Sequence, residues 1–144
     1  MLLWRVSNHR DLSGEGGHFS GGRWHSKGRP IVYTAESSPL ALLEALVHLD
    51  GDMLPEPYQL LRIEGPDDLA FAEWKDDRPP TDQAKSAAWG DAWLAACETA
   101  LARVPAAVAP HAYNWLINPA HPNAAGFRVA ASGRWPWDQR LFKR

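Results

Sequence analysis

Short apolar and β-branched runs recur along this chain, but helical segments interrupt them without a regular strand–helix–strand rhythm. Runs of this kind are typical of strands. Their irregular alternation with helices predicts one mixed α+β domain over residues 1–144, with β-sheet flanked by helices, rather than a doubly wound parallel sheet. The predicted strands are residues 2–7, 30–35, 58–63, 69–74, 104–109, 113–117 and 127–130.

Two segments carry helix signals. Ser38 can cap a helix whose first turn holds Pro39, and no helix breaker interrupts residues 40–49. Residues 81–103 predict one helix, or two helices interrupted near Gly90, because glycine weakens a helix interior. Irregular structure is predicted for residues 8–22 and 133–144.

The charge balance gives no reason to expect a nucleic-acid or anionic-membrane surface. Seventeen acidic residues accompany fifteen basic ones, a formal net charge of -2. The lone Cys97 cannot form an internal disulfide, and no Cys/His spacing predicts a zinc site. No apolar run approaches the roughly 20 residues of a membrane helix, and the apolar stretch before Arg5 is too short for a signal peptide. We therefore expect a cytoplasmic protein without a metal, a membrane partner or direct nucleic-acid binding.

Candidate binding residues are densest at 16–25, where glycines surround Arg23 and Trp24. Glycine permits close backbone approach to a ligand, a guanidinium can bind phosphate through two parallel hydrogen bonds, and an indole offers a stacking surface. The alternative is a surface loop whose Trp24 folds back onto the core. The chain has no Walker-type Gly-Lys-Ser/Thr and no dinucleotide fingerprint, so the glycines alone do not establish phosphate binding.

Glu44 is the candidate carboxylate, because it lies in an otherwise apolar helical segment. Helical spacing puts it one turn from His48, on a face that also carries Ala41 and Ala45. A carboxylate flanked by alanines can lie at the floor of a cleft, where His48 can orient it; the alternative is a solvated face with an ordinary i,i+4 pair. The other face is predicted to carry Leu40, Leu43 and Val47.

Arg5 interrupts the apolar first strand and points opposite Trp4. In a central strand its guanidinium needs an anionic partner from protein or ligand, whereas in an edge strand it can remain in water. Residues 118–122 contain two prolines and predict a structural turn. The spacing of His121 within this turn does not place it at a site.

Several segments match a known pattern in order and approximate spacing: residues 4–5, 11–17, 21–25 (GGRWH), 31–35, 41–44, 90–94, 104–105, 114–122 (ending LINPAHP) and 138–142. Together they resemble the RES domain family, named for characteristic Arg, Glu and Ser residues. The resemblance covers nearly the whole chain. It implies a fold similar to ADP-ribosyltransferases, NAD as the substrate, and a toxin of a bacterial type II toxin–antitoxin pair.

The resemblance also implies a division of roles. Arg5 and Arg23 are expected to contact the NAD phosphates, Tyr33 to pack against the nicotinamide end, and Glu44 to be the catalytic carboxylate, supported by His48. The expected partner is an Xre-like helix-turn-helix antitoxin that covers the active site. The implied catalytic set is Glu44, Arg23 and His48, and the implied NAD-binding set is Arg5, Arg23, Trp24, Tyr33, Thr34 and Glu44.

Ala106 departs from the family pattern, because it follows Val104-Pro105 where a serine is expected. Three interpretations remain open: the pocket works without the hydroxyl, a nearby group such as Asn114 replaces it, or the activity is weakened or redirected. We favour transfer of ADP-ribose to a protein. The alternatives are NAD breakdown by phosphorolysis or hydrolysis, and a catalytically weak module that binds NAD and the antitoxin.

Overall fold

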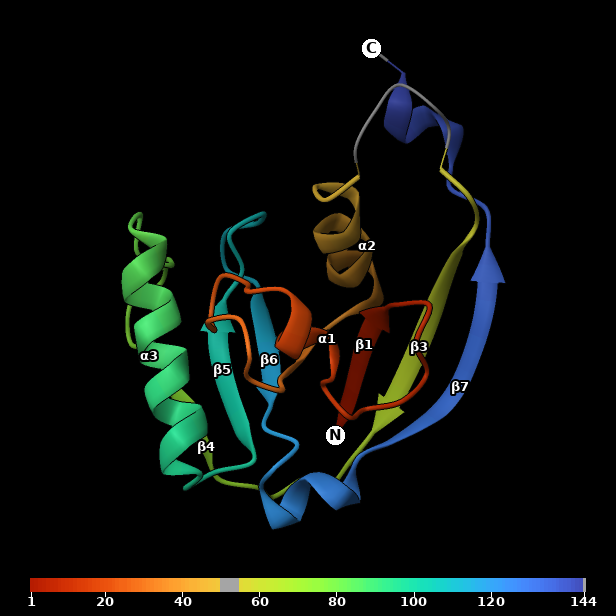
Figure 1. Ribbon diagram of the computed structural model, residues 1–144. Helices are drawn as coiled ribbons and strands as arrows, with labels where there is room; N and C mark the ends of the chain where they lie inside the picture. Colours follow the sequence, from red (N-terminus) through yellow and green to blue (C-terminus); the bar gives the residue numbers. More distant parts are fainter. Residues whose placement is uncertain (50–54, 144) are drawn as a thin grey trace.

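The computed structural model describes residues 1–49 and 55–143. Within these residues the chain forms a sheet flanked by helices (Figure 1). The strands are β1 (Leu2–Val6), β2 (Val32–Ala35), β3 (Tyr58–Glu64), β4 (Phe71–Glu73), β5 (Leu101–Pro105), β6 (Tyr113–Ile117) and β7 (Arg128–Trp135). The helices are α1 (Gly16–Phe19), α2 (Ser38–Leu46) and α3 (Gln83–Ala96), with 3₁₀ turns η1 (Pro122–Gly126) and η2 (Gln139–Phe142).

The sheet has seven strands in the order β4-β5-β6-β2-β1-β3-β7. Only the edge pair β4–β5 is parallel among the described strand pairs; the others are antiparallel. β1 and β2 share a single register pair, Trp4 with Ala35, whereas each of the other neighbouring strands pairs along three or more residues. The sheet is therefore divided at the β1–β2 junction into a β4-β5-β6-β2 half and a β1-β3-β7 half.

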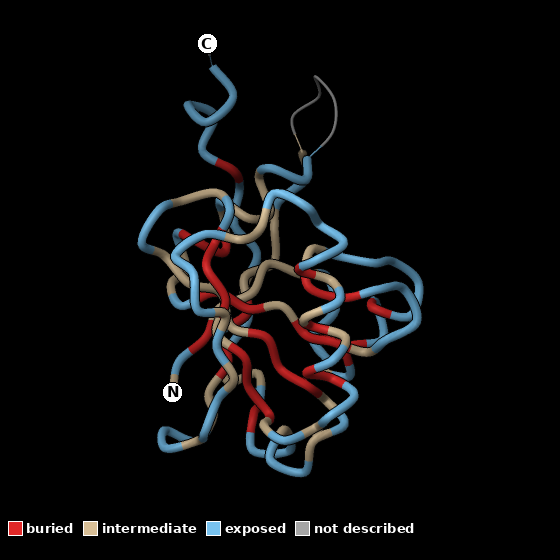
Figure 2. The backbone as a smooth tube through the Cα atoms, turned by 90° about the vertical axis from the view of Figure 1, so that its left-hand side faces the viewer, coloured by how far each residue is buried: buried red, intermediate tan, exposed pale blue. Residues whose placement is uncertain are grey.

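Apolar clusters cover both faces of the sheet. Leu101 and Ile117 belong to one cluster, and their neighbours Ala102 and Leu116 to another. Because successive side chains of a strand point to opposite faces, these clusters lie on opposite sides of the sheet. α3 contributes Trp93 to the second cluster and runs beside β5 in Figure 1. The buried segments gather at the centre of the molecule in Figure 2.

Helix α2 begins and ends earlier than the sequence predicts. The cap is Ser37, whose hydroxyl accepts a hydrogen bond from the Leu40 amide at 3.3 Å, so Ser38 is already helical. The helix ends at Leu46 rather than at residue 49. The predicted apolar face is also wrong, because Leu40 packs with Ala41 under the helix while the two other expected members, Leu43 and Val47, are exposed.

The α3 region corrects two predictions. The helix runs through Gly90 without interruption, as the single-helix alternative predicts, and Gly90 lies directly against the backbone of another segment. It ends at Ala96, and the next residue, Cys97, turns the chain out of the helix with a φ of 52°. Residues 101–103 then belong to β5 rather than to the predicted helix, since pairing with β6 and burial override alanine and leucine helix propensity. The predicted strand at 104–109 accordingly stops at Pro105.

The remaining differences lie at loops and edges. Residues 8–22, predicted to be irregular, contain the short helix α1. β7 continues to Trp135, where irregular structure was predicted, because residues 133–135 pair with the start of β3. β4 is shorter than predicted. None of the helices in the described part of the chain is long and apolar enough to cross a bilayer.

Candidate functional site

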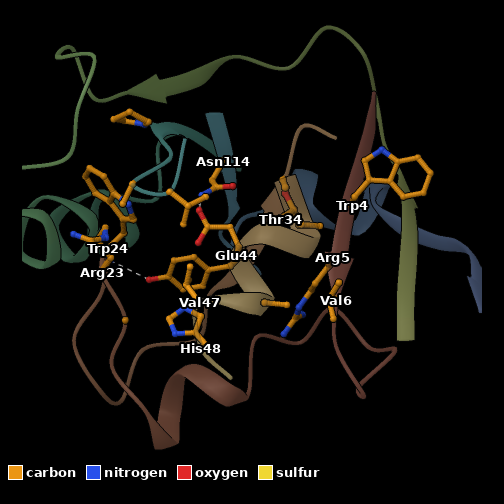
Figure 3. A pocket seen from close by; sticks show the side chains of 18 of the residues that line it. Trp4, Arg5, Val6, Arg23, Trp24, Thr34, Glu44, Val47, His48 and Asn114 are labelled. Carbon is orange, nitrogen blue, oxygen red and sulfur yellow. Dashed lines mark hydrogen bonds between the residues drawn. The ribbon is translucent and has the colours of Figure 1, made fainter. Parts of the chain in front are cut away.

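A cavity of about 660 Å³ opens where the two halves of the sheet separate. Its wall comes from β1, the segment 21–24, β2, α2 and the two residues after it, Gln83 at the start of α3, and the β5–β6 region. Every residue proposed from the sequence lines it: Arg5, Arg23, Trp24, Tyr33, Thr34, Glu44 and His48. Figure 3 labels all of them except Tyr33. The divided sheet thus brings together residues from distant parts of the chain.

Two arginines give the cavity positive charge. Arg5 comes from β1 and Arg23 from the segment before β2, so they approach from different halves of the sheet. Neither forms an ion pair within the described residues. Burial lowers the pKa of Arg5, while the charge of Asp11 acts in the opposite direction. Unpaired guanidiniums at a half-buried wall favour an anionic ligand, above all one with phosphate groups.

Glu44 projects from α2 into the same cavity (Figure 3). The small side chains of Ala41, one turn earlier, and of the neighbouring Ala45 leave space around it. Asn114 of β6 donates a hydrogen bond from Nδ2 to Glu44 Oε1 at 2.8 Å. Glu44 Oε2 has no hydrogen-bond partner among the described residues, so one carboxylate oxygen is held and the other is available to a ligand.

His48 does not hold Glu44 as the sequence predicts. α2 ends at Leu46, so His48 lies beyond the helix and the i,i+4 geometry is lost. Its side chain is exposed at the cavity rim, and no hydrogen bond joins it to Glu44 in the described part of the chain. The carboxylate is oriented from the sheet instead, by Asn114.

A buried network fixes Tyr33. Its hydroxyl accepts a hydrogen bond from the Trp24 amide at 3.1 Å and is bonded to His25 Nδ1 at 2.7 Å. His25 Nε2 lies 2.9 Å from the Ser20 carbonyl. Because a carbonyl only accepts, Nε2 donates to it, and in the neutral imidazole Nδ1 then accepts the Tyr33 hydroxyl proton. Burial raises the pKa of Tyr33 well above its usual range, so this hydroxyl stays protonated. His25 lies in the GGRWH segment, but no spacing pattern in the sequence predicts its bond to Tyr33.

Two residues of the implied NAD-binding set, Trp24 and Thr34, are buried in the protein core. The Trp24 indole is 2% exposed and meets Trp74 and Trp89 edge-on at ring distances of 5.5 and 5.6 Å. It therefore offers little surface for stacking, and the alternative in which Trp24 folds onto the core describes its position. Thr34 is also buried, and its hydroxyl donates to the Trp115 carbonyl at 2.7 Å.

Helix α3 holds the segment that carries Arg23. The Ser86 hydroxyl donates to the Arg23 carbonyl at 2.5 Å. One turn later, a Cβ at Gly90 would lie 1.6 Å from the Trp24 carbonyl oxygen, so the helix and this segment are in backbone contact. The Asp91 carboxylate then accepts from the amide and hydroxyl of Ser26, at 2.8 and 2.5 Å. These contacts fix the backbone from which the Arg23 side chain enters the cavity.

Ala106 is buried at the place where the resemblance led us to expect a serine. It packs in an apolar cluster with Ala35, Leu40 and Ala41 beneath α2. A second cavity of about 440 Å³ adjoins this region and shares Arg23 with the first.

We expect Tyr33→Phe to destabilise the protein by about 1–3 kcal/mol, because the Trp24 amide and His25 Nδ1 both lose their buried partner. Thermal or urea unfolding measures this. Tyr113→Phe is the matched control: the Tyr113 hydroxyl has no hydrogen bond among the described residues, and its ring packs on Arg103. Equal stability of the two variants would contradict the network.

The fold has a counterpart among solved structures. A chain of the MbcT–MbcA toxin–antitoxin complex of M. tuberculosis matches 98% of this chain and 86% of its own length, with a TM-score of 0.71 and 23% identity. The mixed sheet with flanking helices confirms the predicted α+β class, and this solved structure has a similar fold.

The sequence comparisons identify the family. The RES domain matches residues 2–138, and the chain belongs to the RES domain family. It is 42% identical to Toxin Res of Pseudomonas putida over 146 residues, covering 99% of this chain and all of that one. It is 38% identical to the Prs ADP-ribosylating toxin of a Sphingobium strain, covering 99% and 97% of the two chains.

Proposed function

We propose that this chain is the toxin of a type II toxin–antitoxin pair, and that it cleaves the nicotinamide–ribose bond of NAD and transfers ADP-ribose to a protein. The observation that carries the proposal is the half-held Glu44 carboxylate in a cavity walled by two unpaired arginines. The names of full-length relatives, including an ADP-ribosylating toxin, support it.

The residues present suit NAD. The cavity of about 660 Å³ has the size of small-molecule and cofactor sites. Arg5 and Arg23 supply cationic forks for the pyrophosphate. The Tyr33 ring, fixed through its hydroxyl, offers an immobile surface for the nicotinamide end.

Glu44 suits the charge that develops in this reaction. Nicotinamide leaves with the electron pair of the bond to ribose C1′ and departs neutral, so positive charge builds on C1′ and the ring oxygen. A carboxylate beside the ribose stabilises that charge or orients a ribose hydroxyl. The acceptor then bonds to C1′ and releases its proton. Arginine contacts with the remote pyrophosphate hold the reacting bond in place.

A partner that covers this site follows from the toxin assignment. The similar M. tuberculosis fold was solved as a toxin–antitoxin complex. The cavity rim here carries the exposed apolar side chain of Val47 beside His48. We propose an Xre-like helix-turn-helix antitoxin as the protein that closes the cavity.

The test uses purified protein, NAD labelled in the adenylate half, and cell extract. Nicotinamide release together with a labelled protein is the expected result. Nicotinamide release with only free ADP-ribose, or ADP-ribose bearing a new phosphate, would replace transfer by NAD breakdown. NAD binding without nicotinamide release would reduce the chain to a binding module and refute the enzyme.

A further inference from the structure

Asn114 is half-satisfied in its hydrogen bonding. Its strand neighbours are Ala35 on β2 and Val104 on β5, so it lies in the interior of the sheet. Nδ2 donates to Glu44 Oε1 at 2.8 Å, but Oδ1 is buried with no partner. Arg103 Nε is the other such side-chain atom in the described residues.

The carboxylate fixes the direction of this amide. Exchanging the two ends of the Asn114 amide would bring its oxygen against Glu44 Oε1, and two acceptors repel each other. The amide therefore points its donor at Glu44 and leaves its acceptor in the protein interior. A buried acceptor without a partner is destabilising, whereas an apolar side chain of similar shape avoids that penalty. Asn114 is thus poorly explained as a residue that stabilises the fold.

No other side chain performs this task among the described residues. His48 is beyond the end of α2, and Ala106 presents only a methyl group in an apolar cluster. Without Asn114, the Glu44 carboxylate would rotate about its terminal torsions with no partner on either oxygen. With it, Oε1 is tethered to β6 and Oε2 is left toward the cavity.

We propose that Asn114 is a positioning residue that orients the Glu44 carboxylate toward the ribose, in place of the missing serine hydroxyl. This inference rests on the proposed function, in which Glu44 stabilises the charge on the ribose. Asn114 would then affect the rate of the reaction through Glu44, and it would not contribute to binding the remote half of NAD.

The test compares Asn114→Leu with the parent protein. We expect kcat for nicotinamide release to fall about 10- to 100-fold, KM for NAD to stay within about twofold, and Tm to be equal or higher. Asn114→Ala is the second variant should leucine be too large. Wild-type kcat in either folded variant overturns the proposal, as does a rise in KM that accounts for the whole loss.

Asn118 is the matched control, because its buried amide is satisfied at both ends. Nδ2 donates to the Leu94 carbonyl at 3.2 Å and Oδ1 accepts from the Ala120 amide at 3.1 Å. Asn118→Leu should lower Tm and leave the kcat of the remaining folded protein unchanged. If Asn118→Leu lowered kcat as much as Asn114→Leu, the Asn114 effect would come from a general disturbance of the fold, and the proposed positioning role would be overturned.

A second readout separates this inference from the proposed function. The side-chain amide protons of Asn114 are followed by NMR in the parent and in Glu44→Gln. A shift of these signals is expected whether or not the protein consumes NAD, and unchanged signals overturn the contact. If the parent releases no nicotinamide while the signals shift, the proposed function fails and the positioning contact stands.

Discussion

Glu44→Ala is expected to lower NAD turnover at least about 100-fold while the fold persists. In the proposed reaction this carboxylate stabilises positive charge on the ribose, and losing one preorganised electrostatic contact of this kind typically costs about 100- to 1000-fold in kcat. Its removal should also abolish growth arrest on expression. Nicotinamide release measures the reaction, and Tm together with NAD affinity reports the fold.

Glu36→Ala is the control for this variant. Glu36 precedes the same helix and accepts a hydrogen bond from the Tyr113 amide at 3.2 Å, but it does not line the cavity. We expect it to retain turnover. Full NAD consumption by a folded Glu44→Ala protein would remove Glu44 from the mechanism and with it the central assignment of the site.

Gly90→Ala is expected to destabilise the protein by at least about 2 kcal/mol, the range typical of overpacking. In an ordinary helix interior the same change stabilises by roughly 1 kcal/mol, because alanine is the better helix former. Here the new Cβ would lie 1.6 Å from the Trp24 carbonyl oxygen, so α3 and the Arg23 segment must separate. We therefore expect weaker NAD binding as well as a lower Tm.

Ala92→Gly is the control that separates the effect of helix propensity from the effect of the backbone contact at Gly90. Ala92 is exposed on the same helix, so the change should cost about 1 kcal/mol through propensity alone and leave NAD affinity unchanged. Urea unfolding and NAD titration of both variants give the comparison. A Gly90→Ala protein more stable than the parent would mean that the close approach is not maintained in solution.

The sequence predicted the strands whose local residue pattern favours the same structure that they adopt in the folded sheet. β1, β2, β3 and β6 are apolar or β-branched runs between turn residues, and each lies within a residue or two of its predicted bounds. β5 was hidden, because its alanine and leucine content favours helix and only pairing with β6 makes it a strand. The extension of β7 likewise depends on β3, a partner far away in the sequence.

The candidate site also has a part that the sequence predicts and a part that depends on the fold. Arg5, Arg23 and Glu44 were identified by residue type and family resemblance, and the structure brings them to one cavity. What surrounds each of them depends on contacts between segments distant in the chain. The burial of Trp24 and the tether from Asn114 to Glu44 arise only once α3 and β6 are in place. A helix that ends one turn early was enough to separate His48 from Glu44.

The weak junction between β1 and β2 gives the proposed NAD ligand a structural role. Arg5 belongs to the strand on one side of this seam, and Arg23 precedes the strand on the other. A pyrophosphate held by both guanidiniums spans the seam with charged hydrogen bonds, where the backbone provides a single register pair. In the proposed reaction NAD therefore links the two halves of the sheet, and the link lasts until ADP-ribose leaves, because the pyrophosphate stays with the ADP-ribose when nicotinamide departs.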